Sequence, residues 1–256
     1  MNSKRNFLVL VVCFFLLNTI SVNALSDDAR LLALGFPQEY IDLMSSKRKI
    51  EILSYDNIKY LGSTSEDVLI HDPVQDFYQN DIVPLGLISA STMTMSIYSF
   101  AVFDNSTYAL NEIEYTTVAT WNYRPAWTQN DYVAYNWDNS NLRYKDNSFK
   151  VEVKHATKNT LLWSTNVLAS ATVGAFSGIA KLSPSYASKI ITNFALVPVN
   201  TIYGGSNQLF FNYAHQLLPD NIVVTLPTGF GGSISFGGSC DTAAITQTIL
   251  ISYYPY

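Results

Sequence analysis

The chain has 256 residues, of which 15 are lysine or arginine and 20 are aspartate or glutamate, so its formal net charge is −5. Residues 1–24 carry Lys4 and Arg5 and no acid, so the remainder has 13 bases against 20 acids, a balance of −7. An acidic chain lacks the basic face that holds nucleic acid, and charge does not draw it to anionic lipid. Composition therefore argues against a nucleic-acid partner. Any association with a membrane would have to depend on something other than charge.

Residues 1–24 have the three-part pattern of a secretory signal peptide. Lys4 and Arg5 form the basic start, residues 7–17 are an unbroken apolar run, and Val22-Asn23-Ala24 puts small residues where signal peptidase cleaves. The run is too short to span a bilayer, which takes about 20 apolar residues. We expect cleavage after Ala24 and a mature protein that works outside the cytosol.

One cysteine, Cys240, follows the signal peptide, so the mature chain cannot form an intramolecular disulfide. It lies beside Gly237, Gly238 and Ser239, a composition typical of a turn, and no histidine or base is near it in sequence. A reactive thiol needs such a neighbour. We expect Cys240 to be half-buried near a turn and unreactive.

Residues 25–53 predict short helices. Ser26 and Ser45 can cap two of them, Gly35 can end the first, and Pro37 can open the second. The apolar residues expected to share a small core are Leu31, Leu34, Phe36, Ile41 and Met44. Residues 54–83 are polar and acidic and predict a connector that could include one strand.

Residues 84–256 have a β pattern. Phe149, Val151, Val153 and His155 alternate with Lys150-Glu152-Lys154, which is the period of a strand with one buried face. Further strands are predicted at 92–103, 111–123, 131–138, 142–145, 190–199, 208–215, 221–226, 233–236 and 245–254. Closely spaced strands without regular helices between them favour an antiparallel β-sandwich or barrel, here preceded by a short helical appendage.

Two tracts of this β region are distinctive, WNYRPAWTQNDYVAYNW at 121–137 and FNYAHQ at 211–216. With the leader and the Leu34-Gly35-Phe36 helical segment, they make the chain resemble uncharacterised secreted β-rich proteins of Gram-positive bacteria. No activity is attached to those proteins. The resemblance therefore implies export and a β-rich fold, and no mechanism.

The sequence contains only weak candidates for a catalytic nucleophile or for a metal site. His155 and His215 are the histidines of the clearly β-patterned region, and both fall at strand spacing beside apolar residues, which favours a place in the core. The glycines around Ser177 do not have the G-x-S-x-G spacing of a serine hydrolase. The histidines show no paired spacing for zinc. The sequence predicts no metal site and no cofactor.

Carboxylates flank the aromatic tract, as a glycoside hydrolase would require. Their separation in space cannot be obtained from the sequence, so a hydrolase is the third-ranked prediction. The acids are Glu112, Glu114, Asp131 and Asp138.

The aromatic tract is the best candidate for binding, because flat rings beside amide groups suit a sugar ring or a peptide. Trp121 and Trp137 lie at strand spacing and are expected in the core, whereas Trp127 follows Pro125 in a polar link and is expected to be exposed. The predicted ligand-binding residues are Trp127, Gln129, Asn130 and Tyr132.

Two charge-free tracts rich in Ser, Thr and Gly, residues 88–97 and 166–180, support a second hypothesis. Amphipathic strands of this kind can line an oligomeric transmembrane pore, although ordinary sandwich strands have the same pattern. The leading prediction is a secreted binding or structural protein without a cofactor, free or attached to the cell wall. Its partner would be a cell-surface glycan, a wall polymer or a protein, and a membrane enters only in the pore-forming alternative.

Overall fold

The computed structural model describes residues 25–71, 90–125, 130–138, 140–217, 222–228 and 232–252. The predicted signal peptide, and the predicted ligand residues Trp127 and Gln129, lie outside the described residues. The described chain forms two compact units, a helical one that ends at Asp56 and a β-rich one that begins at Asn57.

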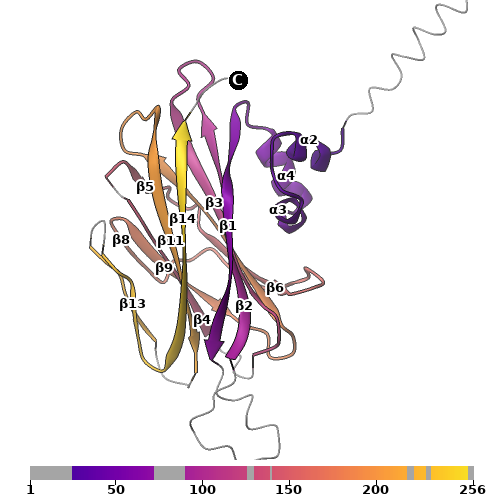
Figure 1. Ribbon diagram of the computed structural model, residues 1–256, viewed down its shortest axis with the longest axis vertical. Coiled ribbons are helices and arrows are strands. Elements are labelled where there is room, and N and C mark those ends of the chain that lie inside the picture. Colours follow the sequence, from indigo (N-terminus) through magenta and orange to yellow (C-terminus); the bar gives the residue numbers. More distant parts are fainter. Residues whose placement is uncertain are drawn as a thin grey trace, which may run out of the picture. The chain divides into compact units, whose positions relative to one another are not determined.

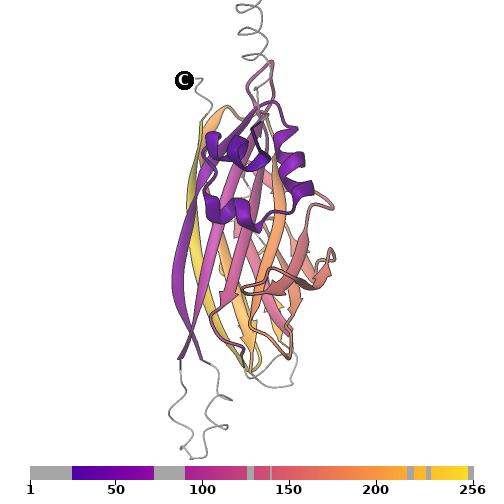
Figure 2. The ribbon, with the colours of Figure 1, turned by 90° about the vertical axis from the view of Figure 1, so that its right-hand side faces the viewer.

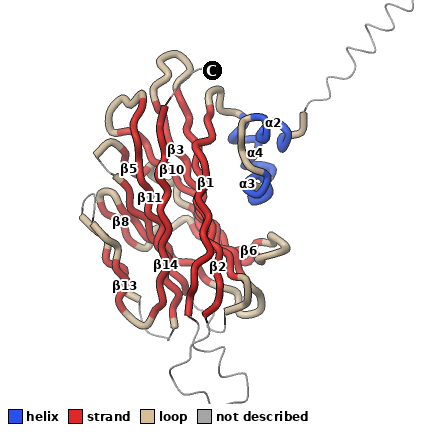
Figure 3. The backbone as a smooth tube through the Cα atoms, in the orientation of Figure 1, coloured by secondary structure: helices blue, strands red, loops and turns tan. Residues whose placement is uncertain are grey.

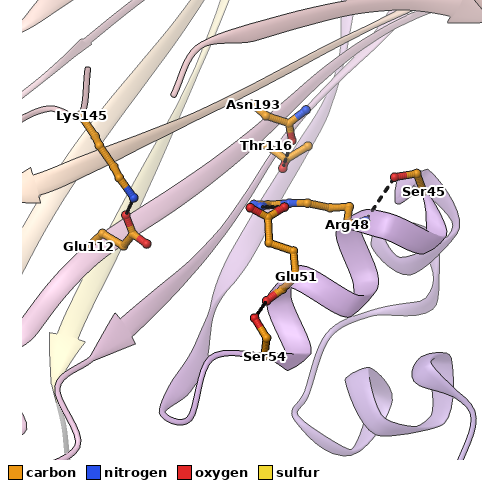
Figure 4. Close-up of polar contacts among 8 residues, drawn as sticks. All are labelled: Ser45, Arg48, Glu51, Ser54, Glu112, Thr116, Lys145 and Asn193. Atoms are coloured by element: carbon orange, nitrogen blue, oxygen red, sulfur yellow. Dashed lines mark hydrogen bonds and ion pairs between the residues drawn. The ribbon is translucent and has the colours of Figure 1, made fainter. Parts of the chain in front are cut away.

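The helical unit consists of α2 (Asp27–Ala33), α3 (Gln38–Leu43) and α4 (Ser46–Leu53) (Figure 3). Ser26 Oγ accepts a hydrogen bond from the backbone N–H of Ala29 at 3.2 Å. Ser45 Oγ accepts one from the N–H of Arg48 at the same distance (Figure 4). Gly35, with φ of +86°, follows the end of α2 in a conformation that favours glycine. Both predicted serine caps and the glycine stop are therefore confirmed.

Of the apolar residues expected to share this core, Leu31, Phe36 and Ile41 are buried. Leu34 is 41% exposed, so its predicted place in the core is wrong. It is the C-cap residue of α2, where the chain leaves the helix and the apolar stripe ends. Met44 is half-buried. The buried residues are Leu31, Phe36, Tyr40, Ile41 and Ile52.

The β-rich unit is built from strands whose bounds follow. They are β1 (Ile58–His71), β2 (Ala90–Phe103), β3 (Leu110–Trp121), β4 (Asn130–Trp137), β5 (Leu142–Tyr144), β6 (Lys150–His155), β7 (Leu161–Thr165), β8 (Ser170–Thr172), β9 (Ala175–Lys181), β10 (Ser188–Pro198), β11 (Gly204–Gln216), β12 (Val223–Thr225), β13 (Ser235–Gly237) and β14 (Cys240–Ser252).

These strands form two main antiparallel sheets that pack face to face, as the sequence predicts (Figure 1). The seven-stranded sheet has the order β1-β2-β3-β10-β6-β7, with β5 also paired to β10, and its long strands lie side by side in Figure 2. The five-stranded sheet has the order β14-β11-β4-β9-β8. Among the described strands, β12 and β13 pair with each other and with no third strand. The fold is an antiparallel β-sandwich.

Alternating side chains from both sheets fill the core. Phe149, Val151 and Val153 of the predicted amphipathic strand are buried, and so are Trp121 and Trp137, as expected. Aromatic rings join the sheets. The rings of Tyr135 on β4 and Phe194 on β10 are 4.9 Å apart, and Phe176 on β9 also lies 4.9 Å from Phe194.

Strand β1 lies in residues 54–83, for which the sequence predicts a connector that could include one strand. Its pairing with β2 shifts register between Tyr60 and Gly62, and Gly62 has φ of +126°. Such a bulge moves the inward-facing positions from odd to even numbers along the strand, which hides the two-residue period. Gln247 Nε2 on β14 donates to the Gly62 carbonyl oxygen at 3.0 Å, so the edges of the two sheets adjoin here.

The two charge-free tracts lie in different sheets, residues 90–97 in β2 and residues 170–180 in β8 and β9. They are therefore not adjacent hairpins in this fold. Across the described residues, none of the helices has the length and apolar character needed to cross a membrane.

Candidate binding surface

Two of the four predicted ligand residues, Asn130 and Tyr132, open strand β4. Asp131 and Val133, which alternate with them along the strand, are buried in the core. Asn130 and Tyr132 therefore face outward from the five-stranded sheet, and both are half-buried. Partial burial raises the pKa of the Tyr132 phenol, and the neighbouring Asp131 carboxyl raises it further. Tyr132 is therefore a neutral hydroxyl donor on this face.

The outward side chains of the five-stranded sheet form a nearly uncharged surface, called here the outer face. Two rows cross its centre from β14 to β8. In strand order they are Ala244, Asn212, Ala134, Ser177 and Ser170, and then Thr246, Phe210, Asn136, Ala175 and Thr172. Tyr132 lies in the next row, paired with Ala214 and Ile179. Lys181, at the end of β9, is the one charged side chain among the described outward residues of the paired strands.

A segment of the chain itself lies on part of the outer face. We call residues 222–228 and 232–237, which include the paired strands β12 and β13, the strap (Figure 1). Thr172 Oγ1 donates to the carbonyl oxygen of Pro227 at 2.7 Å, and Asn136 Nδ2 donates to the carbonyl oxygen of Gly232 at 3.1 Å. The outer face thus binds the polypeptide backbone of the strap through neutral side-chain donors.

Beneath this surface, a buried polar network ties the strand ends together. His215 Nδ1 lies 2.8 Å from Asp131 Oδ1, Tyr213 donates its hydroxyl to Asp131 Oδ2, and Trp121 Nε1 donates to the Tyr213 oxygen at 2.9 Å. Burial raises the pKa of Asp131, and the interaction with His215 opposes that rise. Trp121 and Asp131 bracket residues 122–129, so the network fixes both ends of the link that carries the predicted Trp127 and Gln129.

The same end of the sandwich exposes further aromatic side chains. Tyr123 is 62% exposed and Tyr186 is 48% exposed. Arg124 Nη1 donates to the carbonyl oxygen of Pro184 at 3.1 Å, which joins the described part of the β3–β4 link to the β9–β10 link. The tyrosines add neutral contact area at this end of the sandwich.

The four acids considered for hydrolysis do not line one cleft. Glu112 and Glu114 lie on β3 of the seven-stranded sheet, and Glu112 pairs with Lys145 (Figure 4). Asp131 is buried in the core, and Asp138 follows the opposite end of β4. The structure thus does not place these carboxylates across a substrate from one another.

The remaining candidates for catalysis or metal binding lie in surroundings typical of residues that support the fold. His215 is fully buried in the network with Asp131. His155 is half-buried at the end of β6, and its Nδ1 accepts from the N–H of Thr157 at 3.3 Å. Cys240 is half-buried beside the turn after β13, as predicted. Within the described ranges, no group of three or more His, Cys, Asp or Glu side chains is placed to hold a metal ion.

A scan of the sequence against protein-family models finds no match, and a search of curated proteins finds none either. Several solved structures with partial similarity are surface proteins of Gram-positive bacteria, and others are the macrocyclisation enzyme AvmM, Clostridium perfringens delta-toxin and a bacteriophage tailspike. The collagen-binding subdomain of Enterococcus faecalis surface protein ACE has a TM-score of 0.34 and 11% identity, over 56% of this chain and 88% of that one.

Two others are similar at the same level. The collagen-binding domain of Erysipelothrix rhusiopathiae surface protein RspB has a TM-score of 0.33 and 10% identity, over 78% of this chain and 68% of that one. The C-terminal domain of the Streptococcus agalactiae AgI/II polypeptide BspA has a TM-score of 0.30 and 12% identity, over 74% and 79%.

Sequence reasoning missed the part of the outer face that lies along the strap. Asn136, Phe210 and Asn212 alternate with buried aromatic residues, so their outward position was readable from the two-residue period. The hydrogen bond from Thr172 to Pro227 joins residues 55 positions apart, and no local signal marks it.

Proposed function

We propose that this chain is an exported, non-catalytic binding protein of the cell exterior, and that it holds a neutral polymer on its outer face. The polymer is a cell-surface glycan, a wall polymer or a protein. Export rests on the signal peptide predicted for residues 1–24, and the assignment of Trp127 and Gln129 to the ligand stays a prediction from the sequence.

The observation that carries the proposal is the character of the outer face. Its central rows contain Thr, Ser, Asn and Ala with one phenylalanine, Phe210, so they offer hydrogen bonds and apolar contact without charge. A charged ligand would lose hydration at such a surface and gain no ion pair in return. The small side chain of Ala244, which is exposed, lets a long ligand approach the sheet closely.

Retention on insoluble bacterial wall material tests the proposal. Thr246 is exposed in a central row, so Thr246→Lys should leave the melting midpoint unchanged and strongly reduce retention. Thr201→Lys is the matched control, because Thr201 is exposed in the β10–β11 link, outside the sheet. Equal retention of wild type and Thr246→Lys would refute binding at this face.

Two further assays of the same purified protein distinguish binding from hydrolysis and from pore formation. Release of reducing ends from the wall material would identify a hydrolase. Release of dye from liposomes, together with a shift to large oligomers, would identify a pore-forming protein. Retention without either release is the expected result.

A further inference from the structure

The strap shows which chemical groups the outer face accepts. Two hydrogen bonds described between the sheet and the strap run from a side-chain donor, Thr172 or Asn136, to a main-chain carbonyl oxygen, that of Pro227 or Gly232. In both, the group that the outer face contacts is a backbone carbonyl rather than a particular side chain. Such recognition suits an extended polypeptide, whose carbonyl oxygens are not used in its own secondary structure.

A buried part of the face, in the row next to the two strap contacts, retains hydrogen-bonding capacity that none of the described residues uses. Ser177 lies between Ala134 and Ser170 in a central row, and it faces outward because Phe176 before it packs in the core. Its side chain is fully buried, and its Oγ makes no hydrogen bond with any residue that the structure describes. A buried hydroxyl in this state is costly to the fold, and native proteins keep few of them.

The strap is also weakly held. Strands β12 and β13 pair with each other over three residue pairs and with no other strand in the described part of the chain. Within the strap Ile222 is buried, and residues 223–228 and 232–237 are all half-buried or exposed. A two-stranded hairpin has marginal stability by itself, and segments with little buried surface open at low free-energy cost.

We propose that the outer face binds an extended, uncharged polypeptide, and that this ligand takes the place of the strap. The inference rests on the proposed binding function and names its ligand class. The ligand first contacts the open half of the central rows, where Phe210 and Asn212 are half-buried and Ala244 and Thr246 are exposed. As the strap leaves, ligand carbonyl oxygens accept hydrogen bonds from Asn136, and from the hydroxyl of Ser177 that the strap does not use.

Charge sets the specificity of this surface. The described rows contain no cation for an acidic peptide and no carboxylate for a basic one, and Lys181 lies at the edge. The ligand resembles the strap itself, whose contacting segment presents threonine, proline and glycine at Thr225, Pro227, Thr228 and Gly232.

The probe is a fluorescent peptide of about five Thr-Pro-Gly repeats, which is extended and neutral. Anisotropy should show that the full chain binds it. Peptides of the same length with Glu-Pro-Gly or Lys-Pro-Gly repeats, and dextran as a competitor, should bind about tenfold more weakly or not at all. Hydrogen exchange of the strap should become faster when the Thr-Pro-Gly peptide is bound.

Ser177→Ala gives the sharpest test. Removing an unpartnered buried hydroxyl should leave the melting midpoint unchanged or raise it, whereas loss of a hydrogen bond to the ligand should weaken peptide binding by about fivefold. The matched control is Ser96→Ala. Ser96 is buried in the seven-stranded sheet and its Oγ lies 2.8 Å from that of Ser65, so this variant should lose stability and bind the peptide normally.

Unchanged peptide affinity in Ser177→Ala, or slower exchange of the strap in the complex, would overturn strap replacement. A different result would be that wall material retains the wild type but not Thr246→Lys, while the wild type does not bind the Thr-Pro-Gly peptide. That result would overturn the polypeptide ligand and leave the proposed function standing. Absence of both peptide binding and wall retention would overturn the proposed function as well.

Discussion

Gly178, on the core side of β9, offers a quantitative test of how the five-stranded sheet packs. A Cβ atom added at this position would lie 2.3 Å from Cζ of Phe149 and 3.1 Å from its Cε1. Carbon atoms in contact are normally about 3.5–4.0 Å apart, so the ring would have to move by about 1 Å. The ring of Phe149 is 1% exposed and lies edge-on to Phe176 at 5.3 Å, so it is confined.

The expected magnitude for Gly178→Ala follows from this overlap. The φ of Gly178 is not in the left-handed region, so alanine fits the backbone and only the clash destabilises. Overpacking of this kind costs about 1–3 kcal/mol. At roughly 2–4 °C per kcal/mol for a unit of this size, the melting midpoint should fall by about 2–12 °C.

A double-mutant cycle with Phe149→Leu isolates the contact. Leucine lacks the Cζ and Cε atoms that meet the new Cβ, so the double variant should be more stable than the sum of the two single changes, by about 1 kcal/mol. Thermal melts and urea titrations followed by circular dichroism measure all four proteins. Gly237→Ala is the control, since its nearest neighbours are 3.8 Å and 3.9 Å away. Additive single effects, or an unchanged midpoint for Gly178→Ala, would refute the reasoning.

Three further tests concern the core, the thiol and pH. Trp121→Ala and Trp137→Ala should each destabilise by about 3–5 kcal/mol in thermal melts, whereas Trp127→Ala should keep its midpoint and lose wall retention. The opposite order of stability would contradict the assignment of these residues. Cys240→Ser should change stability by about 1 kcal/mol or less, and a covalent dimer seen only without reductant would contradict an unreactive thiol. Burial raises the folded-state pKa of Asp131 above its ordinary value of 3.8, so the linked stability is present below that value and is lost as pH rises through the raised pKa. Between about pH 4 and 8, the urea midpoint of Asp131→Asn should therefore decline less with rising pH than that of the wild type. An identical decline in the two proteins would refute this linkage.

The helix ends and the burial pattern of one strand were determined by local patterns in the sequence. The serine caps at Ser26 and Ser45 and the stop at Gly35 depend on neighbours within three residues, so they were readable before any fold was known. The burial of Phe149 and Val151 followed from a two-residue period, since one face of a strand in a sandwich meets the opposite sheet.

Other features were decided only by tertiary structure. The extent of strand β1 within the predicted connector could not be read from the pattern, because the bulge at Gly62 shifts its alternation. Asp131 was a candidate carboxylate for hydrolysis, but it is buried with Tyr213 and His215, which are 82 and 84 positions away. The strap depends on the hydrogen bond from Thr172 to Pro227, across 55 positions. The sequence by itself determined the strand period, the helix ends and the acidic balance, because these depend on residues close along the chain. The outer face, its strap and the buried network came from tertiary structure, because they depend on which distant strands become neighbours.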